Sequence, residues 1–175
     1  MHTYDGLDRL LQIEDENSHI KQFVYDKAGN QIKVVDANSN VLEFAYDAAH
    51  QPVSITDNSG NQVNISYDNK GNVVELIDQD DALTKYEYDL GDRITKVSDA
   101  LGHSIEFSYD ALGRITQHTN PNGNATQYTY TPNGNVSAVT DPEGNMETYT
   151  YNAVGWVTDK TDALGHATMY EYDAI

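Results

Sequence analysis

Apolar and polar residues alternate in short runs along the whole chain. In Ser104–Tyr109 the apolar side chains of Ile105, Phe107 and Tyr109 take every second position, which is the pattern of a half-buried strand. Arg114–Thr119 contains several β-branched residues, which also favour strands. No stretch shows the longer period of an amphipathic helix. The pattern therefore predicts an all-β protein built from short strands.

The runs between these strands are tight turns. Asp110–Gly113 separates the two strands, and Asn120–Gly123 follows the second one. Asp, Asn, Pro and Gly are the residues that turns favour, because they bond to the local backbone or adopt its special dihedral angles. Two strands and two turns make a β-hairpin module.

This module recurs without insertion or deletion. A tyrosine returns every 21 residues, and eight full repeats fill residues 4–171, with residues 172–175 starting a truncated ninth. A fixed period of this length indicates one continuous array in which each repeat packs on its neighbours. The phased tyrosines are Tyr4, Tyr25, Tyr46, Tyr67, Tyr88, Tyr109, Tyr130, Tyr151 and Tyr172.

Glycine follows the same period. We expect the glycine positions in the turns to need a positive φ, which Gly adopts without strain. His50 and Asp92 replace Gly in the turn after the tyrosine, and Ser18, Ser39 and Asp81 replace it in the other turn. Together with the tyrosines, the glycines four residues further on are the structural markers of the repeat: Gly29, Gly71, Gly113, Gly134 and Gly155.

Two arrangements of the strands fit this repeat. In an antiparallel sheet of hairpins, equivalent tyrosines lie two strands apart, about 9–10 Å, whereas in a β-solenoid they stack at about 4.8 Å. Two tight turns in each repeat favour the antiparallel sheet. More than about ten twisted strands rarely stay flat, so we expect this sheet to curl.

The second strand changes along the array. Early repeats carry apolar pairs such as Leu11 and Ile13, whereas later ones place an apolar residue one position earlier, as in Ile115. A shift of one residue changes the face of the strand, so we expect a bulge or an altered strand length in the later repeats. For an interior tyrosine such as Tyr67, we expect truncation to Ala to cost about 3–5 kcal/mol, as for a buried side chain.

The composition limits the partners of the chain. Its net charge is −18, but half of the acidic residues are Asp in the two turn positions, where Asp serves turn chemistry. Ten scattered Lys and Arg residues argue against nucleic acid, which needs clustered cations. No apolar run predicts a signal peptide or membrane insertion, and the absence of Cys excludes disulfides.

The repeats contain no motif that predicts catalytic, cofactor-binding or metal-binding residues. His19, His103 and His166 occupy one position of the repeat, but whole repeats separate them, which excludes a shared metal ion. His118 stands within a strand, where we expect a surface or half-buried residue. Asp36–Asn40 lacks the glycine and the distal Glu of a calcium loop.

The pattern Tyr-Asp-x-x-Gly-Arg at residues 109–114 resembles the YD repeat of the RHS family, which includes bacterial RHS polymorphic toxins, toxin-complex shell subunits and teneurins. Thr131, Asn152 and Trp156 depart from the pattern without disturbing the phase. The resemblance implies a segment of a hollow shell around a toxin or effector domain, in a secreted or cell-surface protein. Asp141–Gly144 resembles the family's self-cleavage region, but its position in the repeat favours an ordinary turn.

We therefore expect a structural segment without enzymatic activity, and no cofactor. The alternative is a carbohydrate-binding or adhesion module with glycans as partners. An exposed row of aromatic residues would favour this alternative. Both ends look like cuts through a longer array, so we also expect edge-to-edge self-association through the outermost strands near Tyr4 and Tyr172.

Overall fold

The computed structural model describes residues 1–173 of the chain; the last two residues of the expected ninth repeat lie outside them. Within the described part, every regular element is a β-strand and none is a helix, so no helix there could cross a membrane. The strands are β1 (His2–Tyr4), β2 (Leu10–Glu14), β3 (Ile20–Tyr25), β4 (Gln31–Val35), β5 (Val41–Tyr46), β6 (Pro52–Asp57), β7 (Gln62–Tyr67), β8 (Val73–Ile77), β9 (Leu83–Tyr88), β10 (Ile94–Asp99), β11 (Ser104–Tyr109), β12 (Ile115–Thr119), β13 (Ala125–Tyr130), β14 (Val136–Thr140), β15 (Met146–Tyr151), β16 (Val157–Thr161) and β17 (Ala167–Met169).

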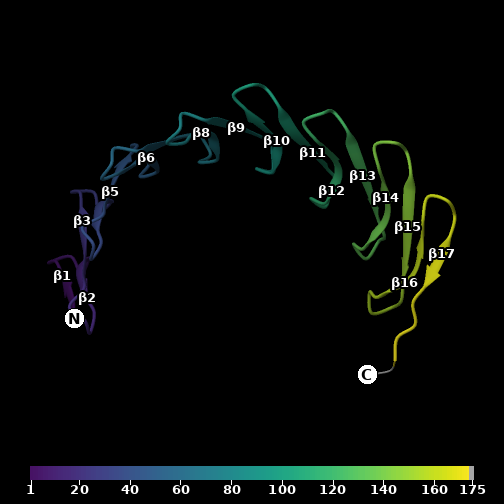
Figure 1. Ribbon diagram of the computed structural model, residues 1–175, viewed down its shortest axis with the longest axis horizontal. Helices are drawn as coiled ribbons and strands as arrows, with labels where there is room; N and C mark the ends of the chain where they lie inside the picture. Colours follow the sequence, from purple (N-terminus) through teal and green to yellow (C-terminus); the bar gives the residue numbers. More distant parts are fainter. Residues whose placement is uncertain (174–175) are drawn as a thin grey trace. The chain divides into compact units, whose positions relative to one another are not determined.

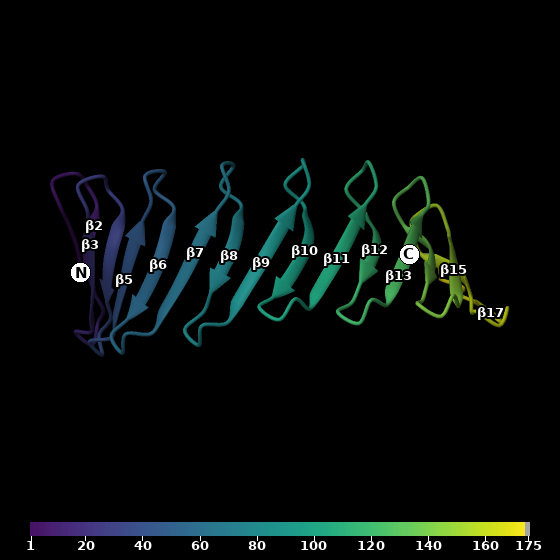
Figure 2. The same cartoon turned by 90° about the horizontal axis from the view of Figure 1, so that it is seen from above.

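The 17 strands form one antiparallel sheet in which strands adjacent in the sequence pair with each other. This confirms the hairpin array and excludes the solenoid, whose coils would pair in parallel. The chain divides into two compact units, Met1–Tyr86 and Glu87–Ile175. Within each unit the strands follow one another round a bend (Figure 1) and the turns alternate between the two ends of the strands (Figure 2).

The hairpins that begin with β1, β3, β5, β7, β11, β13 and β15 carry the same irregularity at their phased tyrosine. In the hairpin of β11 and β12, Ser108 lies opposite Gln117 but Tyr109 lies opposite Ile115, so Thr116 is an extra residue. The bulge expected in the later repeats is therefore present. The early repeats have it too, for example between Val24 and Tyr25, so the expectation that it distinguishes the later repeats is wrong. The bulge goes with the tyrosine of the repeat, whichever apolar residues the second strand carries.

The sheet is a single layer without a core. No described residue is buried, because residues 1–173 form a single sheet and place no second layer on either face. The sequence led us to expect a large cost for truncating Tyr67, as for a buried side chain, yet this tyrosine is only half-buried. The premise of that expectation is corrected because residues 1–173 provide no second layer, which a sheet normally needs to bury its apolar face.

The turns have the conformation that the glycine pattern predicts. All five marker glycines have a positive φ, from 82° at Gly113 to 97° at Gly29. The expected substitutes have it as well: φ is 61–63° at Ser18, Ser39 and His50 and 60° at Asp81 and Asp92. Asp8 also has a φ of 58°, and sequence reasoning missed it although it stands four residues after Tyr4.

Candidate functional site

The phased tyrosines connect neighbouring repeats through their hydroxyl groups. Tyr109 in β11 donates a hydrogen bond of 2.6 Å to the carbonyl oxygen of Ile94, at the start of β10. The acceptor belongs to the preceding repeat, 15 residues earlier. The same bond is made by Tyr25, Tyr46, Tyr67, Tyr130, Tyr151 and Tyr172.

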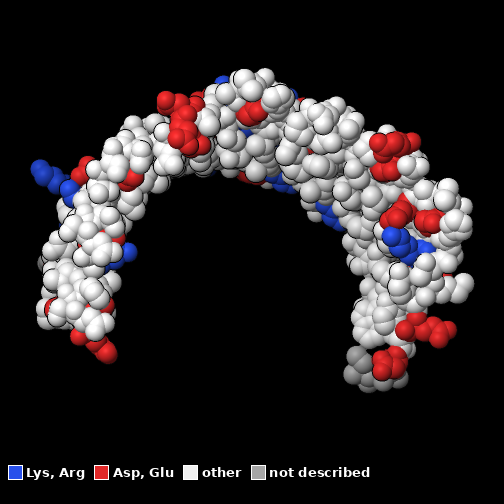
Figure 3. All heavy atoms as spheres, viewed as in Figure 1, with Lys and Arg blue, Asp and Glu red and all other residues white. Residues whose placement is uncertain are grey.

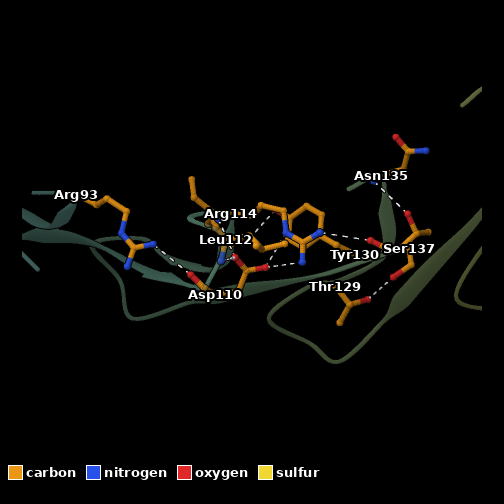
Figure 4. A network of polar contacts seen from close by, with 10 residues as sticks. Arg93, Asp110, Leu112, Arg114, Thr129, Tyr130, Asn135 and Ser137 are labelled. Carbon is orange, nitrogen blue, oxygen red and sulfur yellow. Dashed lines mark hydrogen bonds and ion pairs between the residues drawn. The ribbon is translucent and has the colours of Figure 1, made fainter. Parts of the chain in front are cut away.

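From Asp5 to Asp110, each aspartate after a phased tyrosine closes its turn. In Asp110, Oδ1 accepts hydrogen bonds from the backbone amides of Leu112 and Arg114, and Oδ2 accepts one of 2.6 Å from Arg114 Nε (Figure 4). The amide of Arg114 is the main cause that holds the pKa of Asp110 below its usual value, with further help from its guanidinium. These carboxylates are therefore occupied by the turn itself.

The arginine of the repeat reaches forward to the next one. Arg114 Nη1 donates to the carbonyl oxygen of Thr131, and its guanidinium lies 4.4 Å from the ring centroid of Tyr130. Arg9 and Arg93 make the same two contacts. In the last repeat Trp156 takes this position and packs on Tyr172, with ring centroids 4.8 Å apart. Residues of two different types, Arg and Trp, therefore make the contact with the phased tyrosine of the next repeat.

The other turn uses the same chemistry with different donors. His19, His103 and His166 each place Nδ1 within 2.8–2.9 Å of the Asp four residues earlier, where Asn40 and Asn61 use their side-chain amides. The histidines therefore lie in separate turns. Within residues 1–173 no group of three His, Asp or Glu side chains could hold a metal ion. Acidic atoms on the face in Figure 3 lie in separate groups.

Two further sequence candidates have ordinary structural roles. Asp141–Gly144 is a turn like the others, since the Gly144 amide donates to the Asp141 carbonyl at 3.1 Å and the Asp141 amide to that of Asn145 at 2.9 Å. His118 is a half-buried strand residue, as expected, and its ring centroid lies 5.4 Å from that of Phe107.

The two faces of the sheet differ in chemistry. The aromatic face carries the phased tyrosines and the residues two positions before them. In the second unit it contains a shallow hollow of about 330 Å³, lined by Phe107, Ile115, His118, Tyr128, Tyr130 and Val136.

The opposite face is polar. It carries cross-strand ion pairs such as Lys33 with Glu43 (2.8 Å) and Lys96 with Glu106 (2.9 Å). Hydroxyl pairs such as Thr129 with Ser137, also drawn in Figure 4, lie there too. Side chains thus alternate between the two faces along each strand, and residues that lie opposite one another on neighbouring strands share a face.

Comparison with known proteins agrees with this geometry. Residues 35–159 match the model of the teneurin YD-shell family. No curated protein matches the chain. Among solved structures, a TcdB2–TccC3 complex without the hypervariable C-terminal region matches with 15% identity and a TM-score of 0.72, over 95% of this chain and 11% of that one. A TcdB2–TccC3–Cdc42 structure matches with 15% identity and a TM-score of 0.70, over 91% and 11%.

A Tc holotoxin pore of Photorhabdus luminescens is similar too, with 16% identity and a TM-score of 0.66, over 89% of this chain and 10% of that one. The chain thus spans about a tenth of the length of the structures that it matches. At this identity the structural matches establish the fold.

Proposed function

The chain belongs to the teneurin YD-shell family, and from that premise we propose that its repeats are a non-enzymatic section of a shell wall that encloses or presents a toxin or effector domain. The protein that carries them would act outside the cell or at its surface. Support for the partner comes from the similar structures, one of which is by name a Tc holotoxin pore.

One observation carries this proposal: the most regular side chains of the repeat bind neighbouring repeats. The hydroxyl of Tyr109 donates a hydrogen bond to the backbone of β10, and the carboxylate of Asp110 accepts hydrogen bonds from the amides of its own turn. Arg114 binds forward to Tyr130 and Thr131. Polar groups that a catalytic or ligand site would need are thus engaged either in shaping a turn, as in Asp110, or in linking one repeat to the next, as in Tyr109 and Arg114, and both are tasks of a wall.

We extend this proposal to the whole array. Residues 4–171 would act as one continuous wall of eight repeats, with the phased tyrosines and the five marker glycines setting its period. The ninth repeat begins at Tyr172, and its last two residues lie outside the described part. A single layer without buried residues suits a wall, because its stability comes from neighbouring hairpins and not from a central core.

The carbohydrate-binding alternative has less support. Sugars need converging polar groups beside an aromatic ring, whereas the hollow on the aromatic face is lined almost entirely by apolar atoms and the Tyr130 hydroxyl is bonded to Ile115. The phased tyrosines from Tyr25 to Tyr151 are half-buried, and only Tyr4 and Tyr172 at the two ends are exposed. The row is thus intermediate between the buried row expected for a shell and the exposed row expected for glycan binding.

Limited proteolysis tests the enclosing role. The longest natural chain that contains these repeats and a toxin or effector domain is treated with protease beside the same domain expressed alone. We expect the domain to survive far longer within the full chain, and equal cleavage rates would refute enclosure. A variant lacking the link between repeats, Arg114→Ala with Tyr130→Phe, should shorten the protection. The control Lys33→Ala removes only an exposed ion pair with Glu43 on the opposite face and should leave the protection unchanged.

A further inference from the structure

Seven turns end on an asparagine that stands four residues after the residue that opens the turn. In five of these turns the opening residue is Asp. Its Oδ2 then accepts a hydrogen bond of 2.8–3.1 Å from Nδ2 of the asparagine, and the five asparagines are Asn30, Asn40, Asn61, Asn72 and Asn145. The side-chain amides of these asparagines are therefore part of their turns.

The other two asparagines, Asn124 and Asn135, have lost this bond. Their turns open on Asn120 and Thr131 in place of Asp. Asn120 Oδ1 accepts from the backbone amides of Asn122 and Asn124 at 3.0 Å, and Thr131 Oγ1 accepts from the backbone amide of Asn135 at 3.2 Å. Neither opening residue offers a second carboxylate oxygen. The side-chain amides of Asn124 and Asn135 consequently make no hydrogen bond within residues 1–173.

The same two asparagines stand in an Asn-x-Ser/Thr sequence. Asn124-Ala125-Thr126 and Asn135-Val136-Ser137 both fit it, and this sequence is the acceptor signal for asparagine-linked glycans when the middle residue is not proline. None of the five bonded asparagines is followed two positions later by Ser or Thr. The signal and the free amide therefore occur together in two turns, and both are absent from the other five.

Asn124 has the most accessible side chain of the asparagines with this signal. It is exposed, in the turn between β12 and β13. Asn135 is half-buried, and its Nδ2 lies 3.7 Å from the position that a Cβ on Gly155 would take. A third signal begins at Asn64, which is half-buried in the middle of β7, between the paired strands β6 and β8. A glycan is bulky and needs a surface position, which only Asn124 provides.

We propose that Asn124 carries an asparagine-linked glycan. Its Nδ2 forms a bond to C1 of the first sugar of a lipid-pyrophosphate-linked oligosaccharide. The bond between C1 and the pyrophosphate oxygen breaks, the lipid pyrophosphate leaves with the electron pair, and Nδ2 passes one proton to a base of the transferase. The turn keeps its bonds, because Asn124 takes part only through its backbone amide and carbonyl.

This modification rests on the secreted or cell-surface location proposed above, since the transfer acts on exported chains. It does not depend on an enclosed domain. A glycan would make this turn bulky and hydrated, so the turn between β12 and β13 would face solvent in the assembled protein.

Mass spectrometry of the natural chain, recovered from outside the producing cells, tests the site. Peptide-N-glycosidase in ¹⁸O water releases the glycan and leaves a labelled Asp in its place. We expect the label at Asn124 and none at Asn61 or Asn145, the matched controls in bonded turns. A parallel sample without enzyme corrects for spontaneous deamidation at Asn122, which precedes Gly123.

An unlabelled Asn124 in the exported chain would overturn the proposal and leave the extracellular location standing, and so would label confined to Asn64 or Asn135. A chain found only inside the cells would instead refute the location, and the glycan with it. The two failures are thus distinguishable.

Variants produced in the same cells give an independent test. Asn124→Gln and Thr126→Ala should each increase electrophoretic mobility by the loss of one glycan, whereas Thr126→Ser keeps the acceptor signal and should migrate like the wild type. The matched control Asn61→Gln alters a side-chain bond of another turn but no glycan, and should leave the mobility unchanged. Equal mobility of Asn124→Gln and the wild type would refute the site.

Discussion

Removing one tyrosine hydroxyl tests whether the hydroxyl bonds hold the repeats together. In Tyr109→Phe the ring remains and only the bond of 2.6 Å to the Ile94 carbonyl is lost. A neutral hydrogen bond contributes about 1 kcal/mol net, and the acceptor is half-buried, so water can partly replace the donor. We therefore expect a loss of about 1 kcal/mol, or roughly 2–4 °C in Tm for a chain of this size.

The larger change Tyr109→Ala also removes the contact with the Arg93 guanidinium, 4.8 Å from the ring centroid. A cation–π contact adds about 0.5–1 kcal/mol, and the half-buried ring adds about half of the 1.5–3 kcal/mol of full burial. The sum is about 2–3.5 kcal/mol, which lies mostly below the 3–5 kcal/mol expected for a core tyrosine.

The assay combines thermal unfolding, followed by circular dichroism, with hydrogen exchange of the amides in β10 and β11. Exchange is needed because arrays of repeats can unfold in parts. Tyr4→Phe is the matched control: Tyr4 is 56% exposed and its hydroxyl bonds to no residue among 1–173, so this variant should melt like the wild type. Equal shifts in Tyr4→Phe and Tyr109→Phe would show that the hydroxyl bonds do not contribute to stability.

Four more predictions concern the arginine, pH, calcium and the edges of the sheet. Arg114→Ala should destabilise the link to Tyr130 by at least the 0.5–1 kcal/mol of about one cation–π contact, with faster exchange in β13 than in a Lys33→Ala control. Hydrogen bonds, chiefly from Asn61 to Asp57 and from the Arg114 amide to Asp110, lower the pKa of both carboxyls from 3.8. The ionised carboxylates therefore stabilise the fold above pH 3.8, and this stabilisation is lost as the pH falls through the lowered pKa values. Tm should drop between about pH 5 and pH 2. A Tm that stays constant over that range would contradict the role of the turns. Calcium should raise Tm no more than sodium chloride of equal ionic strength, since screening acts alike for both; a calcium-specific rise reversed by chelator would reveal a metal site. Lysines placed in the outermost strands β1 and β17 should reduce association at the sheet edges, whereas sedimentation that is unchanged by them would assign association to other surfaces.

Much of the fold could be read from the sequence because the repeat allows each residue to be compared with its equivalents. The period of 21 residues, the alternation in Ser104–Tyr109 and the turn residues predicted hairpins, and β11 spans those six residues. The positive φ at His50 and Asp92 could be predicted because both stand where other repeats have glycine. These properties are local, as they depend on steric preferences of single residues and on neighbours a few positions away.

The candidate site depended on contacts between repeats, which no local pattern specifies. The sequence marked Tyr109 as important, but only the structure shows that its hydroxyl binds Ile94 and that Arg114 reaches Thr131. It also places Thr116 in a bulge. The absence of a core was equally hidden, because alternation predicts an apolar face whether or not a second layer covers it. The Asn-x-Thr sequence at Asn124 could have been noticed, yet the exposure and the free side-chain amide of this residue are decided by the surrounding turn. The sequence alone thus determined the period, the strands and the turns, since these follow from local sterics. The tertiary structure decided which groups remain accessible, since burial depends on what packs against each face.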